Sequence, residues 1–287
     1  MDAIAKNVYI EDRFLGVTLG VITQQRGLIQ IDAPPAPEDG RSWRAALMGM
    51  GGGHERMLIN LDSHPDRTLG VRGMDCTVIA HEKTAQAFHN RPNTFKAQGD
   101  ETGANWEAIP GLGSVRWAPP EISFGQQLTL HWSESSVVLE SHAGPTAGAI
   151  WVILPNEKVV FVGDAVMKGQ PPFLAHADLP AWIESLNVLQ DPAYKGYTIV
   201  SGRGGVVTPQ GVRSQAESLK HIQDKLEALG KKRTAAVTAT DKLAEQLLKD
   251  YKAPAAKQKQ YAHRLSYGLR HYYISHYQPS SRHAVDE

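Results

Sequence analysis

The sequence predicts a layered α/β fold, with β-sheets inside and helices outside. Over the first two thirds of the chain, short apolar runs rich in β-branched residues alternate with stretches of helical periodicity. Clusters of polar residues and glycines follow several of these runs directly, as expected where strands end beside a cleft. The last third carries helical patterns alone. We therefore expect one large layered domain followed by a helical extension.

The predicted strands fall into groups separated by a long loop at residues 90–120, which is rich in glycine, proline and tryptophan. A polar break at residues 24–27 predicts that the first two strands form a hairpin. Strands are expected at residues 15–22, 27–32, 56–61, 76–80, 127–132, 136–140, 149–154, 158–162 and 197–200.

Helices are predicted where apolar residues recur every three or four positions and where capping residues mark the ends. Asp178, Leu179 and Pro180 are typical of a helix start, with an N-capping aspartate and a proline in the first turn. Gly230 is typical of a helix end. Helices are expected at residues 39–50, 84–88, from 178 onward, and at 212–229, 241–251 and 257–277.

Composition excludes several classes of protein. Thirty basic and 30 acidic side chains leave the 287-residue chain without net charge, so no global field would attract nucleic acid or an anionic membrane. The single cysteine, Cys76, excludes an internal disulfide or a thiolate zinc cluster. No run approaches the roughly 18 apolar residues that span a bilayer, and residues 1–11 lack the apolar core of a signal peptide. We expect a cytoplasmic protein.

Four polar clusters follow predicted strands at well-spaced intervals, at residues 62–67, 142–146, 163–164 and 202–205. Three of them contain glycine, which lets the backbone turn sharply or approach a ligand closely. Because layered folds bring strand ends together, these clusters predict one shared cleft.

The residues in and around these clusters resemble, in the right order, the motifs of the metallo-β-lactamase fold superfamily. Residues 59–70, INLDSHPDRTLG, resemble its signature loop, His-x-His-x-Asp-His followed by glycine. Residues 160–164, VFVGD, resemble the strand that ends in the metal-bridging aspartate. Residues 78–85, 144–148 and 201–204 resemble three further segments of the family.

This resemblance covers about residues 8–230 and implies the fold in more detail. It implies an αββα four-layer sandwich of metallo-β-lactamase type over residues 1–230. Residues 231–287 then form a C-terminal helical extension packed on that domain.

At the metal-binding positions the family pattern is only partly kept. Members of the family bind two metal ions, usually zinc and sometimes iron or manganese, through histidines and carboxylates, and a bridging hydroxide attacks the substrate. The resemblance implies that His64, Asp66 and Asp164 keep three of these ligand positions.

Four of the five histidine positions carry another residue: Asp62, Arg67, Pro145 and Arg203. Proline has no side-chain donor atom and arginine stays protonated in proteins, so the usual dinuclear site cannot be assembled. Without metals, the aspartates of the site would be buried anions with no compensating charge. We hypothesise that Arg67 and Arg203 replace the metals by pairing with these carboxylates, and on this hypothesis no cofactor is expected.

One alternative keeps a metal. Asp62, His64 and Asp164 suit a single zinc, iron or manganese ion, because carboxylate and imidazole are common ligands of all three. The chain would then be a hydrolase with an atypical mononuclear site acting on an ester, thioester or phosphoester. Asp66 would be its catalytic residue.

The other reading gives the arginines a ligand. Guanidinium groups pair well with carboxylates and phosphates, so Arg67 and Arg203 would bind a small anionic molecule in the old cleft. Alternatively, the two arginines only stabilise the loop. Both readings describe a protein that has lost its dinuclear site and is non-hydrolytic or ligand-binding, which is the class that four replaced histidines favour.

The C-terminal tail, residues 257–283, places five tyrosines among basic residues at helical spacing. Interleaved aromatic and cationic residues can stack nucleic-acid bases, but at this spacing they are more typical of packing residues. We therefore expect the tail to pack on the domain or on a second subunit. An exposed aromatic face would favour a homodimer through the C-terminal helices.

Overall fold

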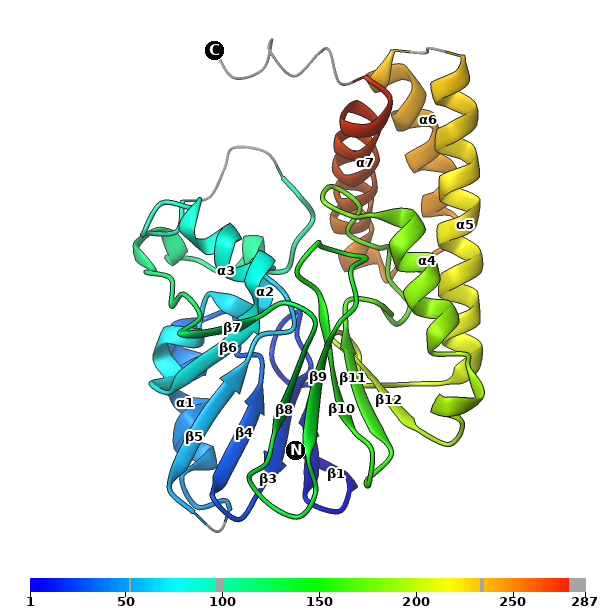
Figure 1. Ribbon diagram of the computed structural model, residues 1–287. Helices are drawn as coiled ribbons and strands as arrows, with labels where there is room; N and C mark the ends of the chain where they lie inside the picture. Colours follow the sequence, from blue (N-terminus) through cyan, green and yellow to red (C-terminus); the bar gives the residue numbers. More distant parts are fainter. Residues whose placement is uncertain (52, 97–100, 233–234, 279–287) are drawn as a thin grey trace.

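Two β-sheets packed face to face form the centre of the molecule, and helices cover both outer faces (Figure 1). Figure 1 is a computed structural model, and it describes residues 1–51, 53–96, 101–232 and 235–278. The layered α/β fold and its C-terminal helical region are therefore confirmed.

Within the described residues, the first sheet has seven strands in sequence order. Its first four strands pair antiparallel, and the pairs from the fourth strand to the seventh are parallel. The strands are β1 (Asp2–Ala5), β2 (Val8–Glu11), β3 (Leu19–Thr23), β4 (Gly27–Ile31), β5 (Glu55–Ile59), β6 (Thr77–His81) and β7 (Ile122–Phe124).

The second sheet, as far as the described residues go, has six strands in the order β13-β12-β11-β10-β9-β8. Only β11 and β12 pair in parallel, and every other pair is antiparallel. The strands are β8 (Gln127–Leu130), β9 (Val137–Ser141), β10 (Ile150–Leu154), β11 (Val159–Gly163), β12 (Thr198–Ser201) and β13 (Val206–Val207).

The helices lie on the outer faces and at the C-terminal end. They are α1 (Pro37–Leu47), α2 (Pro65–Thr68), α3 (Glu82–His89), α4 (Leu179–Val188), α5 (Pro209–Lys231), α6 (Ala236–Leu248) and α7 (Ala255–Tyr277). In the described part of the chain, 3₁₀ helices connect other elements: η1 (Val71–Met74), η2 (Trp106–Ala108), η3 (Leu112–Ser114) and η4 (Pro192–Tyr194).

Three apolar layers hold the sandwich together. The inner layer, with Phe161 and Val152, lies between the sheets, while Trp43 of α1 and Trp182 of α4 anchor the two outer layers. Strands β10 and β11 are buried at every position because both faces of their sheet are covered. This double coverage explains their continuous apolar sequence.

Several boundaries differ from the sequence prediction. The two N-terminal strands and β7 were not expected, because three or four residues are too short for a clear alternating pattern. The predicted helix at 241–251 begins five residues earlier, at Ala236, and its first turns bury the small side chains of Ala239 and Thr240, which give no clear apolar pattern. The helix predicted from Asp178 is confirmed: the Asp178 carboxylate caps it by accepting a hydrogen bond from Ala181 N.

The loop predicted at residues 90–120 builds a small core of its own, although positions 97–100 lie outside the described residues. Phe95, Leu112 and Trp117 pack with Phe88 of α3 and with Leu69. This packing fixes the loop over the end of the first sheet, beside the cleft discussed below.

The C-terminal helices form one packed group with α5. The predicted division at residue 230 falls in the last turn of α5, and Tyr273 of α7 donates a hydrogen bond to the carbonyl of Leu229 there. Tyr261, Tyr272 and Tyr273 are buried within the chain, while residues 279–283 of the predicted tail lie outside the described residues. Homodimer formation stays a prediction.

Among the described residues, no helix is both long enough and apolar enough to cross a membrane.

Candidate functional site

The predicted polar clusters meet at one end of the sandwich, as expected. Residues 60–68 follow β5, Asp164 follows β11 and Arg203 follows β12. Because β4 and β5 run parallel in one sheet, and β11 and β12 in the other, their carboxyl ends bring these segments to a common edge.

Arg67 lies at the centre of this edge, on the short helix α2, and is fully buried. Its Nη1 donates to Oδ2 of Asp32 at 2.8 Å, and its Nη2 donates to Oδ1 of Asp164. Its Nε lies 2.9 Å from Oδ1 of Asp62, in an ion pair without hydrogen-bond geometry. One guanidinium therefore contacts three carboxylates, which share its single positive charge.

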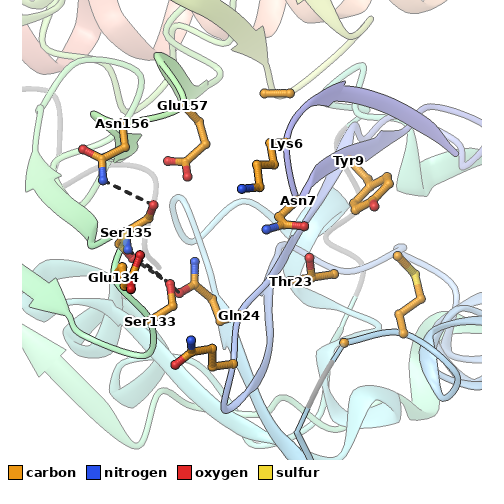
Figure 2. Close-up of a pocket in the computed structure, with 14 residues that line it drawn as sticks. Lys6, Asn7, Tyr9, Thr23, Gln24, Ser133, Glu134, Ser135, Asn156 and Glu157 are labelled. Carbon is orange, nitrogen blue, oxygen red and sulfur yellow. Dashed lines mark hydrogen bonds between the residues drawn. The ribbon is translucent and has the colours of Figure 1, made fainter.

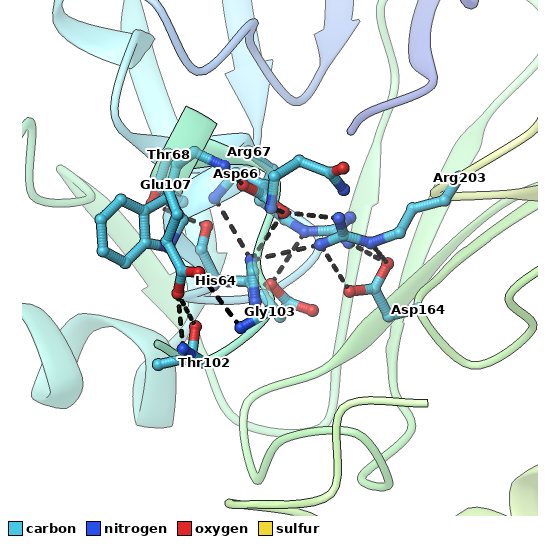
Figure 3. A network of polar contacts seen from close by, with 12 residues as sticks. His64, Asp66, Arg67, Thr68, Thr102, Gly103, Glu107, Asp164 and Arg203 are labelled. Atoms are coloured by element: carbon cyan, nitrogen blue, oxygen red, sulfur yellow. Dashed lines mark hydrogen bonds and ion pairs between the residues drawn. The ribbon is translucent and has the colours of Figure 1, made fainter. Parts of the chain in front are cut away.

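Arg203 occupies the second side of the edge, next to Asp164 (Figure 3). Arg203 is 2% exposed. It forks onto Asp164, with Nε to Oδ1 at 3.0 Å and Nη2 to Oδ2 at 3.1 Å, and its Nη1 donates to Oδ2 of Asp66 at 2.5 Å. These contacts, together with those of Arg67, form the arginine–aspartate network that the sequence led us to expect. We define the network as Arg67, Arg203, Asp32, Asp62, Asp66 and Asp164.

Close backbone approach makes this packing possible. Gly202 N donates to the carbonyl of Gly163 at 2.7 Å, directly beside the Arg67 guanidinium. A Cβ at Gly202 would lie 2.9 Å from the carbonyl carbon of Gly163 and 3.0 Å from both terminal nitrogens of Arg67. The glycine in the last polar cluster therefore leaves room for the arginine.

His64 caps α2 and faces Arg203. Its Nδ1 accepts a hydrogen bond from Asp66 N at 3.2 Å and lies 3.2 Å from Nη2 of Arg203. Burial lowers the pKa of His64 to about 3, and Arg203 adds to this against the opposing attraction of Asp66. The imidazole is therefore neutral, and its Nδ1 lone pair faces two N–H donors.

The four carboxylates divide into two pairs by their pKa values. Burial raises the pKa of Asp32 to about 6 and raises that of Asp62 as well, because burial outweighs the attraction of Arg67. Burial opposes ionisation of Asp66 and Asp164 too, but Arg203 lowers both pKa values below the ordinary range. Asp66 and Asp164 are thus the firmly ionised members.

Asp66 also holds part of the loop at residues 90–120. Its Oδ1 accepts a hydrogen bond from Trp106 N at 2.6 Å, and its Oδ2 accepts one from Asn105 N at 3.1 Å in addition to Arg203. The predicted catalytic carboxylate therefore has partners on both oxygens.

The donor set does not fit a metal centre. The carboxylates of Asp62, Asp66 and Asp164 face guanidinium or backbone N–H groups, and so does Nδ1 of His64. A metal cation would have to displace Arg67 and Arg203 from the carboxylates, and the positive charges of these buried arginines would repel it. Within the described residues, no group of three or more histidine, cysteine, aspartate or glutamate side chains is arranged to hold a metal ion.

A cavity of about 490 Å³ opens beside the network, between the loop at 90–120 and α7. His64 lines it, whereas Arg67 and Arg203 do not. Among the described residues, its lining contains no aspartate or glutamate. The described residues that line it are Ser63, His64, Pro65, Arg91, Pro92, Thr94, Phe95, Lys96, Thr102, Trp106, Trp117, Pro145, Thr146, Phe173, Leu174, Ala175, His176, Arg264, Tyr267 and Gly268.

A second cavity, of about 980 Å³, lies at the opposite end of the sandwich, among the turns that precede β2, β4, β9 and β11 (Figure 2). Its lining mixes Lys6 with Glu134 and Glu157 and with neutral polar groups. None of the predicted site residues lines it.

Sequence reasoning missed three residues at the end of the sandwich that carries the arginine–aspartate network. Asp32 directly follows β4 and adopts a left-handed backbone (φ 60°), but it lies outside the segments compared with the family above. Phe173 lies in an irregular segment, and Arg264 lies on a helix predicted from its packing pattern alone. The position of Asp32 at a strand end was the one usable signal.

Comparison with known proteins identifies the family. The model of the metallo-beta-lactamase superfamily matches residues 63–226, more than half of the chain. A metallo-beta-lactamase from Pontibacter korlensis is 18% identical, with a TM-score of 0.60 over 76% of this chain and 97% of that one. A metallo-beta-lactamase family protein from Thermus thermophilus is 18% identical, with a TM-score of 0.63 over 95% of this chain and 94% of that one.

A stereoselective inverting sec-alkylsulfatase from Pseudomonas sp. is 12% identical, with a TM-score of 0.64 over 96% of this chain and 49% of that one. At these identities the likeness concerns the fold alone. No curated protein matches the chain. The match to the family model over residues 63–226 shows that the chain belongs to the metallo-beta-lactamase superfamily.

Proposed function

We propose that this chain is a metal-free member of its family that binds a small organic anion with an apolar body. The ligand would occupy the cavity beside the arginine–aspartate network. The observation that carries the proposal is the lining of this cavity, which combines cations and aromatic rings without a described carboxylate.

The network supports the metal-free part of the proposal. Two divalent cations would bring four positive charges to this edge, whereas Arg67 and Arg203 bring two and Asp32 and Asp62 have raised pKa values. The network therefore carries fewer positive charges than a dinuclear centre would supply, and burial favours the protonated forms of Asp32 and Asp62. Carboxylates paired in this way are poorly placed to activate water.

The cavity supports the ligand class. Arg91, Lys96 and Arg264 supply positive charge, and rings such as Trp106 and Phe173 supply flat apolar surface. A pocket of this volume suits a small molecule. A carboxylate, sulfonate or phosphate on an aromatic or similar apolar body would match both features.

The test compares an anion with its neutral isostere. In calorimetric titrations at pH 7.5, 2-naphthoate is expected to bind at least about tenfold more tightly than 2-naphthamide, which corresponds to one charge-assisted contact. Equal affinities, or no binding of 2-naphthoate at millimolar concentration, would contradict the proposal.

The hydrolase alternative requires the ion pairs of the network to open, whereas the metal-free proposal requires them to stay closed. It needs Asp62, His64 and Asp164 to release their arginine and N–H partners and hold a metal ion, with Asp66 acting in catalysis. If a hydrolysis rate is found with an ester, thioester or phosphoester, Asp66→Ala and Asp164→Ala should abolish it under that alternative. An unchanged rate in both variants would exclude it.

A further inference from the structure

We infer that helix α7 completes the binding site, and that Arg264 is the residue that binds the anionic group of the ligand. This inference rests on the proposed function and assigns its central contact to the C-terminal helices.

Arg264 is a buried cation whose described hydrogen bonds all go to neutral acceptors. It is 1% exposed, and its Nε donates to the carbonyl of Gly103 at 3.0 Å. Its Nη1 donates to Oε1 of Gln170 at 2.8 Å and to the carbonyl of Pro171 at 3.2 Å. Burial and then Arg203 lower the pKa of Arg264 to about 10. A buried charge of this kind is stabilised by an anion brought against it.

One nitrogen of Arg264 has no hydrogen-bond partner among the described residues. Its Nη2 is shielded from solvent and makes no hydrogen bond within the described part of the chain. The hydroxyl of Thr146 is shielded and unpartnered in the same way, and both residues line the cavity. Buried polar groups normally have partners, so two such groups on one cavity point to a ligand that supplies oxygen acceptors.

Arg264 is also held rigidly. Its guanidinium lies 4.0 Å from the centre of the Phe173 ring. The loop that carries Gly103 abuts α7 so closely that a Cβ at Gly103 would lie 2.5 Å from the backbone nitrogen of Arg264. Glu107 fixes the same loop by accepting a hydrogen bond from Gly103 N at 3.2 Å (Figure 3). A preorganised cation loses little entropy on binding.

Helix α7 is fastened to the network through Asn105. The Asn105 backbone donates to Asp66, while its side-chain oxygen accepts hydrogen bonds from Lys257 at 3.2 Å and from Gln260 at 2.9 Å. The C-terminal helices are therefore an integral wall of the site. The ligand chemistry that fits is a single oxyanion group, with its apolar body against the rings of the cavity.

The experiment titrates 2-naphthoate and 2-naphthamide into wild type and Arg264→Met. We expect the Kd of 2-naphthoate to rise about tenfold to a hundredfold, with a change of less than about twofold for 2-naphthamide. Arg270→Met is the matched control, because Arg270 is exposed on the same helix and lies outside the cavity lining. It should leave both affinities unchanged.

Arg264→Gln serves if the methionine variant does not fold, since glutamine removes the charge but keeps a hydrogen-bond donor. Equal weakening of both probes would assign Arg264 a structural role and overturn the inference, as would no weakening of either. Thr146→Val should weaken the binding of 2-naphthoate selectively, by a smaller factor than Arg264→Met.

If wild type itself does not prefer 2-naphthoate, the proposed function fails. A wild-type preference that survives in the Arg264 variants contradicts this inference alone.

Discussion

Two buried arginines contact the same ring from different surroundings. The guanidinium of Arg203 lies 4.6 Å from the centre of the Phe173 ring, and that of Arg264 lies 4.0 Å from it. Arg203 pairs with Asp66 and Asp164, whereas the described partners of Arg264 are neutral. The comparison teaches that burial of a cation does not define its role. A compensated charge stabilises the fold, and an uncompensated one is available to a ligand.

Removing each arginine should therefore have different effects on stability. Arg203→Met leaves Asp66 and Asp164 buried with a missing partner, and we expect the free energy of unfolding to fall by about 3–5 kcal/mol. Arg264→Met removes a charge that has no described carboxylate partner, so its loss should stay below about 2 kcal/mol. Urea denaturation of both variants measures the difference. Equal losses would break the comparison.

The network should make stability depend on pH through His64. Its folded pKa, about 3, lies below the unfolded value, so between these values the unfolded chain binds a proton that the folded chain does not. Relative to His64→Asn, which keeps a capping side chain, wild type should lose stability as the pH falls from about 6.5 to 4. The expected slope is at most about 1.4 kcal/mol per pH unit. A pH-independent difference in urea denaturation would contradict a neutral His64.

An exposed cation of the cavity should contribute less to the affinity for the ligand than the buried Arg264 does. Lys96 is exposed, so water and salt screen its charge. Lys96→Met should weaken 2-naphthoate by about twofold, well below the effect expected for Arg264→Met. The calorimetric titration used above measures both. A larger effect for Lys96→Met than for Arg264→Met would indicate that the anionic group of the ligand binds at the mouth of the cavity.

The smallest effect is expected from restoring one histidine. Arg203→His and Arg67→His should each fail to create tight zinc binding, because the other arginine still occupies the carboxylates and the other replaced positions remain. Competition with a chelating zinc indicator measures this. A sub-micromolar single site in either variant would count against the network as a replacement for metal.

The sequence was most informative at the strand ends, where its segments resemble the motifs of the family. The polar clusters at residues 62–67, 163–164 and 202–205 lie together as predicted, because parallel strands carry their carboxyl ends to one edge. The replaced ligands also predicted the ion pairs of Arg67 and Arg203, since buried carboxylates need compensating charge. Topology and charge balance are both readable from a chain with family motifs.

The residues that were missed depend on packing between distant segments. Arg264 lies 61 positions after Arg203, on a helix whose apolar pattern shows which residues pack and not what the helix covers. Its contact with Gly103 requires the loop at 90–120 to fold over the cleft, and its contact with Phe173 requires the segment between β11 and α4 to reach α7. Asp32 could have been found from its position at the end of a predicted strand. The sequence around it, an aspartate followed by alanine and proline, was not among the segments that resemble the family.

The central claim is that guanidinium groups stand where the family holds metals. Metal content, measured by mass spectrometry on protein purified without chelator and again after dialysis against zinc, iron and manganese, tests it most directly. We predict less than about a tenth of an equivalent throughout, on the order of contamination for a chain without a closed site. Close to one equivalent, lost in Asp62→Ala, would contradict the account and restore the hydrolase.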